Sequence, residues 1–187
     1  MICKNHLKQI NQAQLSCYKN NFHYELYDEI LIDDEPVLSI FKKLDKPELP
    51  KLKSGDRLVF SKHQMGINYL PFGWQDPEDW GTWSSGKESH LTLPLSNVRP
   101  SAVNLSIRAL VSPKLPSQNI EIWSKGKLLK TVYINQTFGN QLLIEIPKDG
   151  STLDLNFKLP NATKPIDLGI NQDVRQIAIG IESAEFK

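Results

Sequence analysis

The sequence has few of the features that mark membrane, disulfide-rich and nucleic-acid-binding proteins. Its two cysteines, Cys3 and Cys17, are too few for a disulfide framework. It has no run of about eighteen apolar residues, which a membrane-spanning helix requires, and its start lacks the apolar core of a secretory signal peptide. The 22 Lys and Arg residues balance 21 Asp and Glu residues, for a net charge of +1. Because nucleic-acid binders normally carry a basic face, we expect no nucleic-acid partner.

The sequence also lacks the motifs of common catalytic and cofactor sites. It has neither a G-x-S-x-G nucleophile motif nor a glycine-rich loop for phosphate. The four histidines are scattered, without metal-ligand spacing: His6, His23, His63 and His90. Glu78 with Asp76 or Asp173 is the only carboxylate pair that suits glycoside hydrolysis. We therefore expect no catalytic residue, metal or cofactor, and an enzyme acting on glycosides is the least favoured alternative.

The first fifty residues differ in character from the rest of the chain. Apolar residues spaced three and four apart predict an amphipathic helix: Cys3, Leu7, Ile10, Ala13 and Cys17. An acidic segment follows between Glu25 and Glu35, and its interleaved apolar residues favour a solvated strand edge over a cation site. Prolines from Pro36 to Pro50 then indicate a linker. We predict residues 1–50 to form this helix, strand-like segment and linker, and residues 51–187 to form the main domain.

From residue 51 onward, apolar and polar residues alternate with the period of a half-buried β-strand. Expected strands lie at 56–60, 91–95, 103–111, 120–123, 128–134, 142–146, 153–159 and 174–181. Pro94 places its strand at a sheet edge, and Ser124-Lys125-Gly126 indicates a hairpin turn. A sheet with one apolar face must pack that face against a second sheet. The sequence therefore predicts an all-β, jelly-roll-like antiparallel β-sandwich with a short N-terminal helical or irregular segment.

Residues 73–86 interrupt this alternation and contain three of the four tryptophans. Burying one indole stabilises a fold by about 4–6 kcal/mol before entropy is subtracted. Such a loop must therefore either close the end of the sandwich or offer a ring to a ligand. A pyranose stacks its C–H face on an indole, and its hydroxyls bind carboxylates. The predicted carbohydrate-binding residues are Trp74, Asp76, Glu78, Trp80, Trp83, Ser84 and Arg175.

These candidates are expected to differ in exposure. Trp80 and Trp83 are three residues apart and are expected to pack inward, whereas Trp74, which follows a glycine, is expected to be exposed. Asp173 and Arg175 lie two apart where the last predicted strand begins, and residues two apart in extended chain share a face. We expect Arg175 to pair with a carboxylate of the tryptophan-rich segment, either Glu78 or Asp76, and so to fix the geometry of the loop.

The pattern G-W-x-x-P-E-x-W-G-x-W-S-x-G at residues 73–86 resembles a β-sandwich domain of bacterial envelope proteins. That domain follows the membrane part of envelope glycosyltransferases and phosphoglycerol-transferase-like proteins. Residues 142–147 (L-x-I-x-I-P) and 165–181 are also similar to it, although Lys164 and Ala178 depart from its pattern. The resemblance covers residues 50–187 and implies a glycan or sugar-lipid ligand and a membrane-bound transferase as partner. It also implies a place in the periplasm or on the outer face of the inner membrane.

Two functions are consistent with these observations. The first is a non-catalytic carbohydrate-binding domain in envelope polysaccharide or glycolipid assembly. The second is a purely structural packing or docking domain of a membrane-bound sugar or phosphoglycerol transferase. In either case this chain, which has no spanning helix, is expected to be a detached part or a separately encoded relative of such a protein.

Overall fold

The structure, a computed structural model, describes residues 24–32, 35–43 and 48–187, and the chain divides into two units, Met1–Glu48 and Leu49–Lys187. In the first unit, β1 (Tyr24–Ile32) and β2 (Glu35–Lys43) form a two-stranded antiparallel sheet. The predicted linker is therefore wrong over β2, where Pro36 stands at the second position of the strand and leaves the rest free to pair. The helix predicted around Cys3–Cys17 lies outside the described residues.

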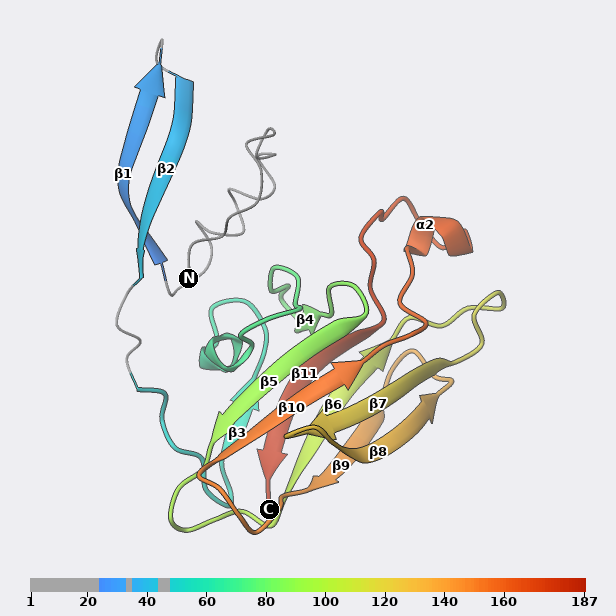
Figure 1. Ribbon diagram of the computed structural model, residues 1–187. Coiled ribbons are helices and arrows are strands. Elements are labelled where there is room, and N and C mark those ends of the chain that lie inside the picture. The colour runs from blue at the N-terminus through green and yellow to red at the C-terminus, as the bar shows by residue number, and fades with distance from the viewer. Residues whose placement is uncertain (1–23, 33–34, 44–47) are drawn as a thin grey trace. The chain divides into compact units, whose positions relative to one another are not determined.

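The second unit is an all-β sandwich of two antiparallel sheets (Figure 1). One sheet has the order β5 (Glu88–Pro94), β10 (Thr152–Lys158), β7 (Gln118–Ser124) and β8 (Lys127–Ile134). The other has the order β3 (Arg57–Val59), β11 (Ile179–Phe186), β6 (Ala102–Ala109) and β9 (Asn140–Glu145), with β4 (Thr82–Trp83) paired to β11. Apart from the β7–β8 hairpin, each strand from β5 to β11 is followed by one in the opposite sheet. These crossings give the jelly-roll-like arrangement and confirm the predicted fold class.

The core lies between the two sheets and follows the predicted alternation. In β10 the inward side chains Leu153, Leu155 and Phe157 are buried, whereas the residues between them face outward. Strand β6 buries Val103, Leu105 and Ile107 from the opposite sheet in the same way. Because successive side chains point to opposite faces of a strand, the residues between these positions form the two outer surfaces of the sandwich.

Two local predictions are confirmed. The turn between β7 and β8 has Lys125 at φ 48° and Gly126 at φ 75°, and two consecutive positive φ angles suit a tight hairpin. Strand β5, which ends at Pro94, is an edge strand of its sheet.

Two short helical elements complete the unit, the 3-10 helix η1 (Met65–Tyr69) and α2 (Pro165–Leu168). No helix in the described residues is long and apolar enough to cross a membrane.

The last strand differs from its predicted limits. A strand was predicted at residues 174–181, but β11 begins at Ile179 and continues to Phe186. Before it, an Asp173 carboxylate oxygen accepts the Arg175 backbone N–H at 2.9 Å. This local hydrogen bond replaces a bond of the strand ladder, so Asp173 and Arg175 meet directly instead of sharing a strand face.

Candidate functional site

The tryptophans of residues 73–86, here called the tryptophan-rich segment, lie on two different sides of the sandwich. Trp74 is half-buried, and its Nε1 donates to the carbonyl oxygen of His90 at 2.6 Å. Its ring meets the edge of Phe157, a core residue of β10, with 6.2 Å between the centroids. The expected exposed platform is therefore partly covered, because Trp74 packs against the core on the side of the four-stranded sheet.

Trp80 and Trp83 lie together on the outer face of the other sheet. Their rings meet edge to face at a centroid distance of 5.1 Å. Gly180 of β11 makes room for them, since a Cβ at this position would lie 2.9 Å from Cζ3 of Trp80. The Arg108 guanidinium stands 3.9 Å from the centre of the Trp80 ring. Both tryptophans are half-buried, so this pair covers the sheet from outside without entering the core.

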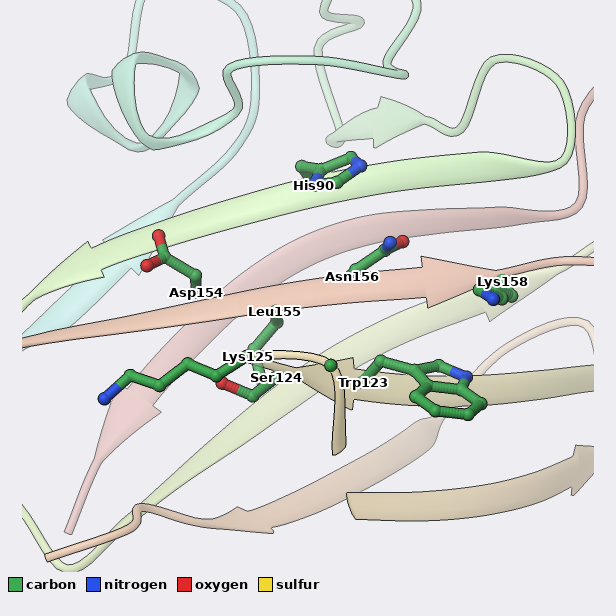
Figure 2. A pocket seen from close by; sticks show the side chains of 9 residues that line it. His90, Trp123, Ser124, Lys125, Asp154, Leu155, Asn156 and Lys158 are labelled. Atoms are coloured by element: carbon green, nitrogen blue, oxygen red, sulfur yellow. The ribbon is translucent and has the colours of Figure 1, made fainter. Parts of the chain in front are cut away.

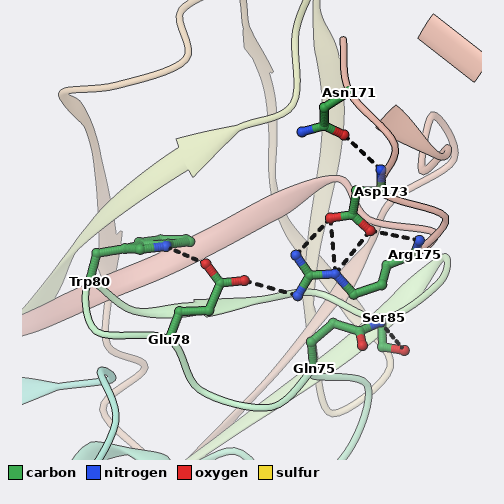
Figure 3. A network of polar contacts seen from close by, with 7 residues as sticks. All are labelled: Gln75, Glu78, Trp80, Ser85, Asn171, Asp173 and Arg175. Carbon is green, nitrogen blue, oxygen red and sulfur yellow. Dashed lines mark hydrogen bonds and ion pairs between the residues drawn. The ribbon is translucent and has the colours of Figure 1, made fainter. Parts of the chain in front are cut away.

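A polar network holds this segment against the residues that precede β11 (Figure 3). Arg175 donates through Nη1 to Glu78 Oε1 at 2.9 Å and through Nη2 to Asp173 Oδ2 at 2.7 Å. The other carboxylate oxygen of Glu78 accepts from Trp80 Nε1 at 2.7 Å. The expected pairing of Arg175 with Glu78 is thus confirmed, and both oxygens of Glu78 are engaged within the protein.

This network does not provide the chemistry of a carboxylate pair in glycoside hydrolysis. Hydrogen bonds from Arg175 hold the pKa of Asp173 below its usual range, and the Asp173 carboxylate raises the pKa of Arg175. Asp173 is therefore ionised at neutral pH and cannot donate a proton as a general acid. A hydrolase needs one protonated carboxylic acid beside the ionised one, and Glu78 and Asp173 are instead joined through a single guanidinium.

We expect Asp173→Asn to lower the free energy of unfolding at pH 7 by about 1–2 kcal/mol, because it removes a charge-assisted hydrogen-bond acceptor that is partly exposed. The pKa of Asp173 is lower in the folded protein than in the unfolded chain. Its contribution to the free energy of unfolding is therefore complete above the unfolded pKa of about 4, and it is lost as the pH falls through the folded pKa. Urea titrations should show the gap between variant and wild type closing below about pH 4. Asp76→Asn, at an exposed position, is the control, and a gap independent of pH would contradict this role.

The remaining predicted site residues lie in different environments. Ser84 is fully buried, and its Oγ accepts the backbone N–H groups of Ala178 and Ile179 at 3.0 and 3.1 Å. It therefore secures the segment to the start of β11 and has no surface to offer a ligand. Asp76 is exposed. Of the seven predicted residues, Glu78, Trp80, Trp83 and Arg175 are joined by direct contacts, whereas Trp74 packs on Phe157, Ser84 is buried and Asp76 is exposed.

A second candidate site, which the sequence did not predict, lies on the outer face of the four-stranded sheet. The strand register places His90 of β5 opposite Asn156 of β10, and Asn156 opposite Trp123 of β7. These three outward-facing side chains form a row across neighbouring strands. They border a hollow of about 420 Å³, here called the sheet groove (Figure 2), which is lined by His90, Trp123, Ser124, Lys125, Gly126, Asp154, Leu155, Asn156 and Lys158.

The side chains around the sheet groove are held by their neighbours. Glu88 accepts from Asn156 Nδ2 at 2.5 Å and contacts His90 Nε2 at 3.2 Å. These hydrogen bonds lower the pKa of Glu88. Trp123 Nε1 donates to Glu121 Oε2 at 3.0 Å, which fixes the orientation of the indole. The groove thus combines an aromatic ring, an amide and charged groups on hydrogen-bonded strands.

The sequence contained one signal for this site. Trp123 occupies an outward position of β7, between the inward-facing Ile122 and Ser124, and tryptophan is a residue type that is enriched at binding interfaces. The partners of Trp123 could not be predicted, because the strand register depends on which strands pair. Among the described residues, no group of three or more His, Cys, Asp or Glu side chains could hold a metal ion.

No family model and no curated protein matches the sequence. Solved structures with a similar arrangement include a family 6 carbohydrate-binding module, with 13% identity, coverage of 74% of this chain and 98% of the module, and a TM-score of 0.42. A family 6 module from Clostridium stercorarium in complex with cellobiose has 10% identity, coverage of 74% and 98%, and a TM-score of 0.37. A family 36 module in complex with calcium and xylotriose has 8% identity, coverage of 74% and 100%, and a TM-score of 0.37. The chain is thus similar to β-sandwiches of carbohydrate-binding modules, while its own fold assignment rests on the strand pairing described above.

Proposed function

We propose that the sandwich is a non-catalytic carbohydrate-binding domain and that the sheet groove is its binding surface. The observation that carries this proposal is the row formed by His90, Asn156 and Trp123 beside a hollow of about 420 Å³. A hollow of this size lies within the range of small-ligand sites, about 300–1,000 Å³. Its lining joins an aromatic surface to a few polar groups, which is the combination that orients a ligand in such sites.

The chemistry of the groove suits a pyranose. The indole of Trp123 offers an apolar ring on which the C–H face of a sugar stacks. Asp154 is exposed and offers carboxylate oxygens as acceptors, while the ammonium groups of Lys125 and Lys158 donate. A sugar hydroxyl both donates and accepts, so acceptors and donors placed around one ring can satisfy several hydroxyls at once.

Trp123→Ala tests the groove, and Trp80→Ala is its matched control. Both tryptophans are half-buried and lie on the outer faces of opposite sheets. The full chain is screened on a glycan array, and affinities for the bound glycans are measured by calorimetry. We expect Trp123→Ala to weaken binding at least about tenfold, or about 1.4 kcal/mol, whereas Trp80→Ala should leave affinity unchanged.

The opposite result would show that the glycan-binding site lies in the tryptophan-rich segment, as the sequence predicted. Binding would then be lost in Trp80→Ala and kept in Trp123→Ala. If no glycan binds the wild-type chain, the carbohydrate proposal fails and the structural packing or docking role takes its place. One observation favours that role for residues 73–86: Glu78, Trp80 and Arg175 bind one another.

We infer further that the glycan belongs to bacterial envelope polysaccharide or glycolipid assembly, in the periplasm or on the outer face of the inner membrane. The support is the resemblance of residues 73–86 and 165–181 to the domain attached to envelope transferases. A membrane-bound transferase is the partner that this context implies. An array that includes envelope and plant glycans tests the inference, because binding restricted to plant glycans would contradict it.

A further inference from the structure

We propose that the sheet groove selects anionic glycans, with a sugar ring stacked on Trp123 and a carboxylate or phosphate of the ligand bound by Lys158 or by Lys125, which lie at opposite ends of the groove (Figure 2). This inference rests on the proposed function, since it names the ligand class of the same groove. Two lysines and one carboxylate, Asp154, are among the nine lining residues.

Lys158 occupies the position that a stacked sugar needs. Its Nζ stands 4.7 Å from the centre of the Trp123 ring, where it makes a cation–π contact. A sugar that stacks on this face must displace the ammonium from the ring. A neutral sugar offers that ammonium only hydroxyl groups, whereas an anionic sugar gives it a new ion pair within the groove. The displaced lysine therefore favours a ligand that carries negative charge.

Lys125 lies at the turn between β7 and β8 and also lines the groove. Its Nζ contacts Asp149 Oδ2 at 3.3 Å, but both side chains are largely exposed, at 53% and 81%. Such an exposed ion pair contributes little to stability and can be exchanged for another. A ligand carboxylate or phosphate in the groove can therefore replace Asp149 as the partner of Lys125.

Carboxylates on the neighbouring strands offset part of the positive charge of the two lysines. Glu88 faces Lys158 across the β5–β10 pair, and Glu121 faces it across the β10–β7 pair. Glu88 already accepts from Asn156 and Glu121 from Trp123, and both carboxylates keep their charge beside Lys158, so an anionic ligand has to compete with them for its ammonium. Asp154 is the carboxylate that lines the groove itself, and it remains an acceptor for sugar hydroxyls.

The test compares matched neutral and anionic ligands with the full chain. One pair is an unsubstituted xylo-oligosaccharide and the same oligosaccharide bearing a glucuronic acid. A second pair is an oligomannoside with and without a phosphate monoester. We expect the anionic member of at least one pair to bind about fivefold to tenfold more tightly at low salt. The preference should shrink at high ionic strength, where exposed ion pairs are screened. The pair that shows it identifies the anionic group as carboxylate or phosphate.

The variants separate charge from shape. Methionine keeps much of the aliphatic stem of lysine and removes its charge, so the double variant Lys125→Met/Lys158→Met should bind both members of each pair equally. Lys62→Met, at an exposed position outside the groove, is the control and should keep the preference. Equal binding of neutral and anionic ligands by the wild type, or a preference that survives the double variant, overturns this inference and leaves the proposed function intact. If no glycan binds, neutral or anionic, the proposed function itself fails.

Discussion

Replacing Gly73 by alanine should destabilise the sandwich by about 3 kcal/mol or more, because two separate costs add at this position. Gly73 has a φ of +80°, a backbone conformation that an L-residue adopts only with strain. A Cβ there would overlap the carbonyl oxygen of Glu88 and lie 2.6 Å from the Cα of Ser89. Both neighbours belong to the backbone of β5, which is paired with β10 and cannot give way. Thermal denaturation should show a melting temperature lower by roughly 10 °C.

Gly86→Ala is the matched control for this prediction. Gly86 ends the same segment with a φ of +75°, but nothing lies within 4 Å of its Cβ position. We therefore expect it to cost only the backbone strain, about 1 kcal/mol. The difference between the two variants measures the close approach of Gly73 to β5. Equal losses would show that the backbone of β5 yields to the added methyl group and that the contact is unimportant.

Phe157→Ala should cause a loss of similar size, about 3–5 kcal/mol, by leaving a cavity between the sheets. Phe157 is 1% exposed, and its ring also packs against the ring of Trp74 in the tryptophan-rich segment. The variant thus loses core packing together with the contact that anchors Trp74. Urea denaturation measures the loss as a change in midpoint at a nearly constant slope.

Phe138→Ala provides the comparison at a surface position. Phe138 is 63% exposed, so its removal should change the free energy of unfolding by no more than about 0.5 kcal/mol. If Phe157→Ala were equally mild, the sheets would have to close over the missing ring. Phe157 would then not be the element that joins the tryptophan-rich segment to the core.

Much of the sandwich was predictable because alternation along a strand is a direct consequence of burying one face. The buried Leu153, Leu155 and Phe157 show this in β10. The hairpin at Lys125 and Gly126 and the edge position of Pro94 followed from local backbone chemistry. The predictions were wrong where a local or partner-dependent contact decides the outcome. Asp173 captures the Arg175 backbone ahead of β11, and β2 forms only by pairing with β1.

The candidate site was less predictable than the fold. Unusual composition drew attention to residues 73–86, and a pairing of Arg175 with either Glu78 or Asp76 was expected from their charges; the structure shows the pairing with Glu78. The sheet groove has no comparable motif, since His90, Trp123 and Asn156 stand singly in three strands. Only the register of β5, β10 and β7 brings them into one row. A sequence does not state which strands pair or at which residues, so this row could not be inferred from it.

Strand β10 has a further consequence for how this protein can change. Its inward side chains belong to the core, whereas its outward side chains, Asn156 among them, line the groove. Substitutions of the two kinds should therefore act on different properties: those facing inward on stability, and those facing outward on the proposed ligand preference. A library randomised at His90, Trp123 and Asn156 should sample many specificities while its members melt at nearly the same temperature. If the proposed binding function holds, the sandwich is an evolvable scaffold, in which recognition and stability are inherited through alternate residues of the same strands.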